Sequence, residues 1–282
     1  WSTNKNKVLE IPGYIPTQQG TISGHLKVNG SWLEPGLPVG VWNLLKTNGV
    51  MRTEKEWQDA ARVADSNFDK IGDMSFVDKN GDGKISFGED RQIVGDPNPD
   101  FIFGWTNNFS YKNFDFSMVM QGVTGNEIVN RKRGDRRWHS ELNYDADQVE
   151  NRWTGEGSTN SYPSAAGSIN PWNIAKFNSF YVEDGSYFRI QNVQVAYTFP
   201  KKDFGKFKMP SVRLSLTADR PLTIFKANSF SPELSSVKND DGTMPSSSYG
   251  FDEQVYPLSS SYTLGIRIFY SFLIFNANRV YE

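Results

Sequence analysis

The sequence predicts an all-β protein, in particular a transmembrane antiparallel β-barrel with long external loops. Aromatic residues make up 14% of the 282 residues although the mean hydropathy is −0.56, which indicates alternating rather than continuous burial. No run reaches about 18 apolar residues, so we expect no transmembrane helix, whereas membrane strands alternate and give a weak hydropathy signal. Short and long connections follow one another, as in membrane barrels with tight turns at one rim and long loops at the other.

The strongest strand signal is a hairpin between residues 101 and 122. In FIFGWTNNFSY (101–111), large rings alternate with small or polar residues. After the dipeptide KN, the segment FDFSMVMQG (114–122) repeats this alternation. A period of two residues is typical of a strand with one apolar and one polar face.

Later segments follow the same period. SYFRIQNVQVAYTF (186–199) changes phase after Ile190, which predicts a β-bulge near Asn192. Clear alternation recurs at 211–218 and 261–272, and weaker candidates lie at 21–30 and 38–47. The long connections 48–100, 123–185 and 219–260 are polar, and the connection 200–210 is short. We therefore expect the long connections on the outer side of the barrel.

One convincing helix is predicted over RTEKEWQDAARVA (52–64). Thr53 can cap its N-terminus, and Glu54 and Glu56 fall in the first turn, where carboxylates are favourable. One face of this helix is formed by Trp57, Ala60, Ala61 and Ala64. The helix is short, and we expect it within a loop insertion.

A soluble β-sandwich with long loops is the alternative, because its strands also alternate. The longer segments have roughly 10 to 14 residues, which suits a tilted membrane crossing of about 9–11 residues. Aromatic rings also stand near the strand ends, as in an interfacial girdle. These rings belong to Tyr111, Phe114, Tyr197, Phe199, Tyr270 and Phe272. Both features favour the barrel.

The segment DKNGDGKISFGE (78–89) fits the EF-hand calcium loop. The oxygen ligands would come from the side chains of Asp78, Asn80 and Asp82, the carbonyl of Lys84, Ser86 and both oxygens of Glu89. Gly83 provides the sharp turn, and Ile85 stands at the apolar eighth position. The sequence therefore predicts a bound Ca²⁺. Helices that would make the loop a sensor are not indicated on either side, so we expect a structural role.

Composition excludes several classes of function. The net charge of −2 and pI near 5.8 argue against nucleic-acid binding, and the absence of cysteine excludes disulfides, zinc–thiolate sites and a thiol nucleophile. The two histidines, His25 and His139, lack metal-ligand spacing, and Glu183 and Asp184 are interpreted as a loop-to-strand turn. No GxSxG motif occurs. We therefore expect no enzymatic activity.

The order of these segments resembles the C-terminal third of SusC/RagA-like TonB-dependent outer-membrane transporters. The resemblance runs from about Val8 to Phe272. It is carried by FVDKNGDGKISFGEDRQIVGDPNPDFIFGWTNNFSYKNFDFSMVMQGVTGNEIVN, NRWTGEGSTNSYP, FYVEDGSYFRIQNVQVAYTFPKK and YPLSSSYTLGIRIFYSF. The tail 273–282 follows the aromatic residue at which such chains normally end, so its place in the barrel is open.

The resemblance implies a barrel of about 22 strands in the outer membrane of a Gram-negative bacterium, to which residues 1–272 contribute roughly the last seven or eight strands. The chain begins without a signal-peptide pattern, and we expect it to be part of a longer product whose plug and N-terminal strands lie elsewhere. The implied partners are the rest of the barrel and plug, TonB, outer-membrane lipid and a SusD-like surface lipoprotein that acts as a lid.

The resemblance also implies the import of oligosaccharides or oligopeptides. Trp138, Trp153 and Trp172 lie in one predicted external loop, together with a basic run from Arg131 to Arg137. Indole rings stack on sugars and also anchor protein interfaces, so these tryptophans are candidates for substrate or lid contact. The alternative function is that of a secreted, calcium-stabilised β-sandwich that binds glycans.

Overall fold

The computed structural model describes residues 1–11, 31–63, 70–86, 88–130, 145–164, 178–204, 207–232, 234, 250–252 and 257–269. The chain divides into two compact units. The loop unit comprises Trp1–Ile102, Val123–Tyr187 and Phe225–Pro257, and the sheet unit comprises Phe103–Gly122, Phe188–Ile224 and Leu258–Glu282. None of the helices among the described residues is long and apolar enough to cross a membrane.

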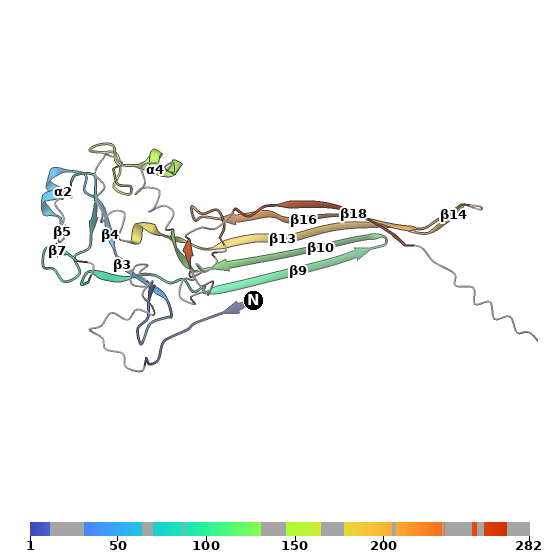
Figure 1. The fold of residues 1–282 in the computed structure, drawn as a ribbon, viewed down its shortest axis with the longest axis horizontal. Helices are drawn as coiled ribbons and strands as arrows, with labels where there is room; N and C mark the ends of the chain where they lie inside the picture. Colours follow the sequence, from blue (N-terminus) through green and yellow to red (C-terminus); the bar gives the residue numbers. More distant parts are fainter. Residues whose placement is uncertain are drawn as a thin grey trace, which may run out of the picture. The chain divides into compact units, whose positions relative to one another are not determined.

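Long neighbouring strands dominate the fold and confirm the predicted all-β class (Figure 1). The main sheet has the order β1-β9-β10-β13-β16-β18. Its strands are β1 (Ser2–Thr3), β9 (Phe101–Tyr111), β10 (Phe114–Thr124), β13 (Tyr187–Phe199), β16 (Ser211–Phe225) and β18 (Ser261–Phe269). The predicted hairpin is therefore confirmed, with β10 two residues longer than the 114–122 expected. Strands β16 and β18 pair antiparallel from Ser211↔Phe269 to Asp219↔Ser261.

A bulge was predicted near Asn192 of β13, and the register between β13 and β16 does shift in this region. The Arg189 side chain donates a hydrogen bond to Thr223. The Asn192 side chain donates to Asp219, and the Gln194 side chain donates to Thr217. The three partners on β16 all have odd numbers, but those on β13 change from odd to even. The pairs at 189–223 and 192–219 are separated by three residues on β13 and by four on β16, so the register between the two strands shifts by one residue.

Strand β16 runs past its predicted end at residue 218. The sequence DRP at 219–221 looks like a strand breaker, and Arg220 does take a left-handed φ of 49°. The chain is nevertheless held there, because the Arg220 Nε donates to the Ser259 carbonyl at 3.0 Å and the Ser260 hydroxyl donates to the Arg220 carbonyl at 2.7 Å. The predicted strand 261–272 is confirmed as far as Phe269, and the candidate at 21–30 lies outside the described residues.

The connection 200–210 is itself a small hairpin. Strands β14 (Lys202–Phe204) and β15 (Phe207–Met209) pair antiparallel, with Lys202 opposite Met209. This hairpin joins β13 to β16 at the end of the sheet where β9 also turns into β10 (Figure 1).

The long connections, expected as polar loops, fold together with the segment 31–45 into short strands in the loop unit. Strands of two to five residues are too short to give a periodic signal in the sequence. They are β2 (Ser31–Trp32), β3 (Val41–Leu45) and β8 (Arg91–Gly95) in one sheet, β12 (Val182–Asp184), β11 (Glu127–Asn130) and β17 (Phe251–Asp252) in another, β4 (Thr47–Val50) with β6 (Met74–Phe76), and β5 (Arg62–Val63) with β7 (Lys84–Ile85).

The hydrophobic core of the described residues lies mainly in this loop unit. All five residues of β3 are buried, which confirms and shortens the weak candidate at 38–47. One cluster is formed by Trp42, Leu44, Val129 and Tyr181, and a second by Leu45, Val63, Met74, Phe76 and Ile85. Parts of the long connections that were expected to be external loops therefore carry buried apolar surface together with β3, and such burial is the dominant source of folding free energy.

The predicted helix begins where expected but is shorter. The α2 helix (Glu54–Asp59) starts after Thr53, whose hydroxyl accepts from the Glu56 amide at 3.2 Å. It ends at Asp59 rather than residue 64, because β5 pairs in parallel with β7 and buries Val63. The short helices α4 (Ala146–Asn151) and η1 (Ser179–Tyr181) were not predicted.

Candidate functional site

The sheet unit has one exposed apolar face. Along β18, the even-numbered residues Tyr262, Leu264 and Ile266 are between 65% and 71% exposed. Exposed apolar side chains of the same face also occur on the neighbouring strands, an even number of residues apart on each strand. They are Trp105, Phe109, Tyr111, Phe114, Val195, Phe199, Leu216, Leu222 and Ile224. A contiguous apolar surface of this kind marks contact with a membrane or a partner rather than with water.

The opposite face of the sheet is polar, and its side chains bond to each other across the strands. The alternation predicted from the sequence therefore separates two chemically different surfaces. The hydrogen bonds are Ser110–Asp115 at 2.8 Å, Gln194–Thr217 at 2.9 Å, Asn192–Asp219 at 2.7 Å, Ser261–Asp219 at 3.1 Å and Arg213–Thr198 at 3.3 Å, with an ion pair between Arg213 and Asp115. Such a sheet can stand between an apolar and an aqueous phase.

The predicted calcium loop is a compact turn held by its own side chains. The Asp78 carboxylate accepts from the Gly81 amide at 2.6 Å and from the Gly83 amide at 2.8 Å. Both glycines have φ of 77°, and the pattern requires this left-handed conformation at Gly83. The Asn80 amide group donates to the Glu89 carboxylate at 3.4 Å, so the third and twelfth loop positions face each other.

A further carboxylate organises this loop and was missed in the sequence. Asp90, fully buried, accepts from the Lys79 amide at 3.0 Å and from the Ser86 amide at 2.7 Å. It lies one residue beyond the twelve-residue pattern, so the motif carried no signal for it. Because it satisfies two backbone donors from opposite sides of the loop, Asp90 fixes the turn that places the candidate ligands.

The loop residues partly fit a calcium site. Side-chain oxygens from Asp78, Asn80, Asp82, Ser86 and Glu89 belong to the hard donor class that Ca²⁺ requires. Among the described residues, however, no group of three or more His, Cys, Asp or Glu side chains has a spacing that could hold a metal. The structure therefore does not bring the carboxylates of Asp78, Asp82 and Glu89 together into a metal-binding cluster.

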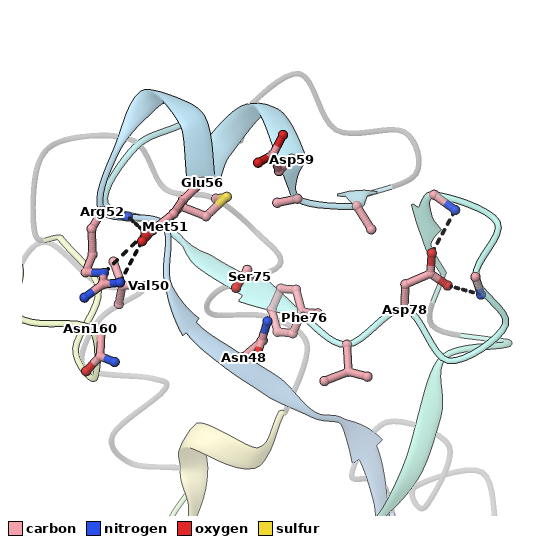
Figure 2. A pocket seen from close by; sticks show the side chains of 15 residues that line it. Asn48, Val50, Met51, Arg52, Glu56, Asp59, Ser75, Phe76, Asp78 and Asn160 are labelled. Carbon is pink, nitrogen blue, oxygen red and sulfur yellow. Dashed lines mark hydrogen bonds and ion pairs between the residues drawn. The ribbon is translucent and has the colours of Figure 1, made fainter.

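A pocket of about 840 Å³ lies between this loop, α2 and the β4–β6 pair (Figure 2). Arg52 and Glu56 form an ion pair at its edge, with the Arg52 amide also donating to Glu56 at 2.7 Å. These contacts hold the pKa of Glu56 below its usual range and raise the pKa of Arg52. Asp78 borders the same pocket, with its carboxylate directed to the two glycine amides (Figure 2).

A polar network in the loop unit joins segments that are distant in the sequence. The buried Asn130 donates to Glu183 at 3.2 Å and to the Asn228 carbonyl at 2.7 Å. The Asn228 amide in turn donates to Glu183 at 2.6 Å. The pKa of the neighbouring Asp184 is lowered by hydrogen bonds from Ser186 and by the positive charge of the Lys226 ammonium. Glu183 and Asp184 therefore hold β12 and its neighbours together, and they lie in the strand β12 rather than in the turn that the sequence predicted.

Of the three candidate tryptophans, the described residues include Trp153. It is partly buried, and its ring packs so closely on Gly72 that a Cβ there would lie 2.6 Å from the indole. Trp138 and Trp172 lie outside the described residues, as do the basic run, His25 and His139. A role of the three tryptophans in substrate or lid contact therefore stays a prediction.

Comparison with known proteins identifies relatives over most of the chain. TonB-dependent receptor P26 of Formosa agariphila is 32% identical over 268 residues, which is 95% of this chain and 26% of that receptor. TonB-dependent receptor SusC of Bacteroides thetaiotaomicron is 24% identical over 212 residues, covering 73% of this chain and 18% of SusC. The chain thus spans about a quarter of the length of the curated relatives it matches. No protein-family model matches the sequence.

Solved structures share the fold. The RagAB peptide importer in the 'open-open' state aligns with a TM-score of 0.60 and 17% identity over 94% of this chain and 25% of that chain. The 'closed-closed' state aligns with a TM-score of 0.59 and 20% identity over 85% and 24%. P26 and SusC are both receptors by name, which agrees with the expectation that the chain is not an enzyme.

Proposed function

Because this chain is homologous to the TonB-dependent receptors, with a SusC/RagA-like fold, we propose that its sheet unit is part of the barrel wall of such a receptor in a bacterial outer membrane. The observation that carries the proposal is the pair of faces on one sheet. Exposed apolar side chains such as Leu264 and Ile266 would meet lipid, and the bonded polar side chains opposite would face the aqueous interior.

In this proposal, residues 1–272 supply C-terminal strands and external loops, and the tail 273–282 follows them. The sheet has open edges on its own, and unsatisfied edge strands are not tolerated in lipid. The strands would therefore continue into the rest of a barrel of about 22 strands that encloses a plug. The plug and the N-terminal strands would then belong to the parts of the receptor outside residues 1–282.

The whole receptor would import oligosaccharides or oligopeptides, coupled to TonB and assisted by a SusD-like lipoprotein lid. The similarity to SusC and to a peptide importer supports import of a nutrient but favours neither substrate. The folded loop unit supports the lid contact, since a surface with its own buried core can hold a constant shape against a partner.

We also propose that loop 78–89 binds Ca²⁺ as a structural ion. Side chains of Asp78, Asn80, Asp82 and Glu89 and the carbonyl of Lys84 would hold it, with Ser86 at the ninth position. A bound ion supplies fixed positive charge to a loop rich in carboxylates. The loop is already tied to α2 through the β5–β7 pair, so the ion would stabilise this junction.

The glycan-binding sandwich remains the second candidate, and the apolar face argues against it. In a soluble sandwich that face would be covered by a second sheet. In the described residues, Ala196 is the sole buried apolar side chain of the sheet unit. An apolar face left uncovered fits lipid contact better than a soluble fold.

Single cysteines test the barrel wall, because this chain contains no native cysteine. We would place a cysteine at each position from Thr263 to Ile268 in the full receptor and react cells with a membrane-impermeant maleimide. We expect labelling at 263, 265 and 267, which would face water, and protection from labelling at 264, 266 and 268, which would face lipid. Equal labelling at all positions, or solubility of the full receptor without detergent, would contradict the proposal.

A further inference from the structure

We propose that the turn end of the sheet unit binds the phosphate headgroups of anionic phospholipids. The site combines a basic collar, formed by Lys112, Lys201 and Lys202, with a ring cluster, formed by Phe114, Tyr197 and Phe199. This inference rests on the proposed barrel wall and adds a lipid class to it.

The collar and the rings lie at one end of the sheet. β9 ends and β10 begins beside Lys112, and β13 ends at Phe199, just before the two other lysines (Figure 1). Hydrogen bonds fix these segments together, from the Thr198 amide to the Asn113 carbonyl at 2.8 Å and from the Ser211 hydroxyl to the Phe199 carbonyl at 3.1 Å. The charges are therefore presented by a defined surface rather than by separate turns.

The ring cluster is continuous, and two of its three rings, Phe114 and Phe199, are exposed. The centroids of Phe114 and Tyr197 are 4.6 Å apart, and those of Tyr197 and Phe199 are 4.7 Å apart. Phe114 is 54% exposed, and the neighbouring Tyr111 is 58% exposed. These rings belong to the same face as the exposed apolar side chains of the sheet, so they point toward lipid. Amphipathic rings at a strand end mark the depth of the headgroups.

Positive charge is concentrated at the same end. The segment 200–210 contains four lysines and one aspartate, although the whole chain has a net charge of −2. Lys112 and Lys202 are exposed, and the Lys112 ammonium lies 5.3 Å from the centroid of the Tyr111 ring. Lys112 also has a φ of 53°, which glycine or asparagine adopts with less strain. Turn geometry therefore does not explain the lysine at this position.

Lysines beside rings at headgroup depth fit the phosphates of anionic lipids. Each basic side chain near an anionic surface strengthens association by about fivefold. Rings that pointed away from the apolar face would fit a water-soluble partner instead. Because the rings and the apolar face are continuous, we assign the collar to lipid and not to a soluble protein.

Native mass spectrometry of the detergent-solubilised full receptor can test this assignment. The receptor would be mixed with equal amounts of phosphatidylglycerol and phosphatidylethanolamine of the same acyl chains. We expect preferential retention of phosphatidylglycerol, and a reduction of about 25-fold in its affinity in the double variant Lys112→Gln/Lys202→Gln. The matched control Lys5→Gln/Lys7→Gln removes two charges from the loop unit and should keep the preference.

A second variant distinguishes the loss of a lipid-binding charge from a failure to fold. Lys112→Gly removes one charge and suits the left-handed turn, so it should fold at least as well as the native protein and still lose about fivefold in phosphatidylglycerol affinity. Equal retention of the two lipids by the native receptor, or equal loss in the control, would overturn the inference. A receptor that needs no detergent would overturn the barrel wall itself, which separates the two failures.

Discussion

Arg213 on β16 forms an ion pair with Asp115 on β10, although β13 lies between these two strands. The pair is completed by Ser110, which donates to Asp115 at 2.8 Å, and by Thr198 of the intervening strand, 3.3 Å from the Arg213 guanidinium. Side chains on the polar face thereby connect four strands, in addition to the backbone bonds between neighbours.

Removing the ion pair should weaken the sheet in a salt-dependent way. In a double-mutant cycle with Arg213→Ala and Asp115→Ala, the two substitutions should be less than additive, because each destroys the same contact. The coupling, measured by the urea midpoint of the folded receptor in micelles, should shrink in 1 M salt, where the screening length is about 3 Å. Additive effects at low salt would show that the two side chains act independently.

Gly95→Ala should destabilise the loop unit by about 1–3 kcal/mol. A Cβ at this position would lie 2.9 Å from the ring of the buried Trp42, 3.1 Å from the Glu127 Cβ and 3.2 Å from Val182. Hydrogen exchange of the β3 and β11 amides would measure the loss. Gly88→Ala is the matched control, because no atom lies within 4 Å of its Cβ, and an equal effect there would contradict the packing argument.

Asp90→Ala should lower the free energy that is needed to open the loop 78–89 by about 2–3 kcal/mol. The substitution leaves the Lys79 and Ser86 amides without their shared acceptor. Asp90→Asn retains one acceptor oxygen and should be affected less. Protection of these two amides against hydrogen exchange is the direct measurement. If both amides stay protected in Asp90→Ala, the carboxylate does not hold the turn.

Calcium titration should show whether Ca²⁺ affinity depends on the proposed ligands of the loop 78–89. Asp82→Ala removes the carboxylate at the fifth position and should lower Ca²⁺ affinity by at least about tenfold in calorimetry of the intact receptor. Asp203→Asn, an exposed acid on the β14–β15 hairpin, removes the same charge elsewhere and should leave affinity unchanged. No heat of binding in the native receptor would remove the calcium proposal.

The stability of the β11–β12 region should fall at acidic pH. The pKa of Asp184 lies below its unfolded value of 3.8, since the carboxylate is favoured by Ser186 and Lys226. This contribution is present above the unfolded pKa and is lost as the pH falls through the lowered folded pKa. Hydrogen exchange of β12 between about pH 5 and 2.5 should therefore depend less on pH in Asp184→Asn than in the native protein.

The long strands could be predicted from the sequence because their side chains meet two different environments over many residues. An irregularity near Asn192 was also indicated, since Phe188 and Ile190 fall out of step with Val193 and Val195, and the register between β13 and β16 shifts there. The loop unit could not be predicted in the same way. Its strands are short, and β3 is buried at every position, so it has no alternation to detect.

The candidate site shows the same division. The N-terminal cap of α2 and the positive φ of Gly83 in the loop 78–89 depend on local spacing, and both could be predicted from the sequence. The end of α2 depends on the parallel pairing of β5 with β7, about twenty residues away, and was therefore predicted incorrectly. The role of Asp90 depends on how the loop closes, which no linear pattern contains.

The parallel β5–β7 pair also limits how small a fragment can reproduce this loop. Ile85 is fully buried against a cluster that includes Val63, and the Arg62 amide donates to the Gly83 carbonyl at 3.0 Å. A synthetic peptide of residues 78–89 would lack both the strand that flanks its eighth position and the carboxylate of Asp90. The shortest excisable segment that keeps the α2 cap, the paired strand and the closing acid runs from Thr53 to Asp90.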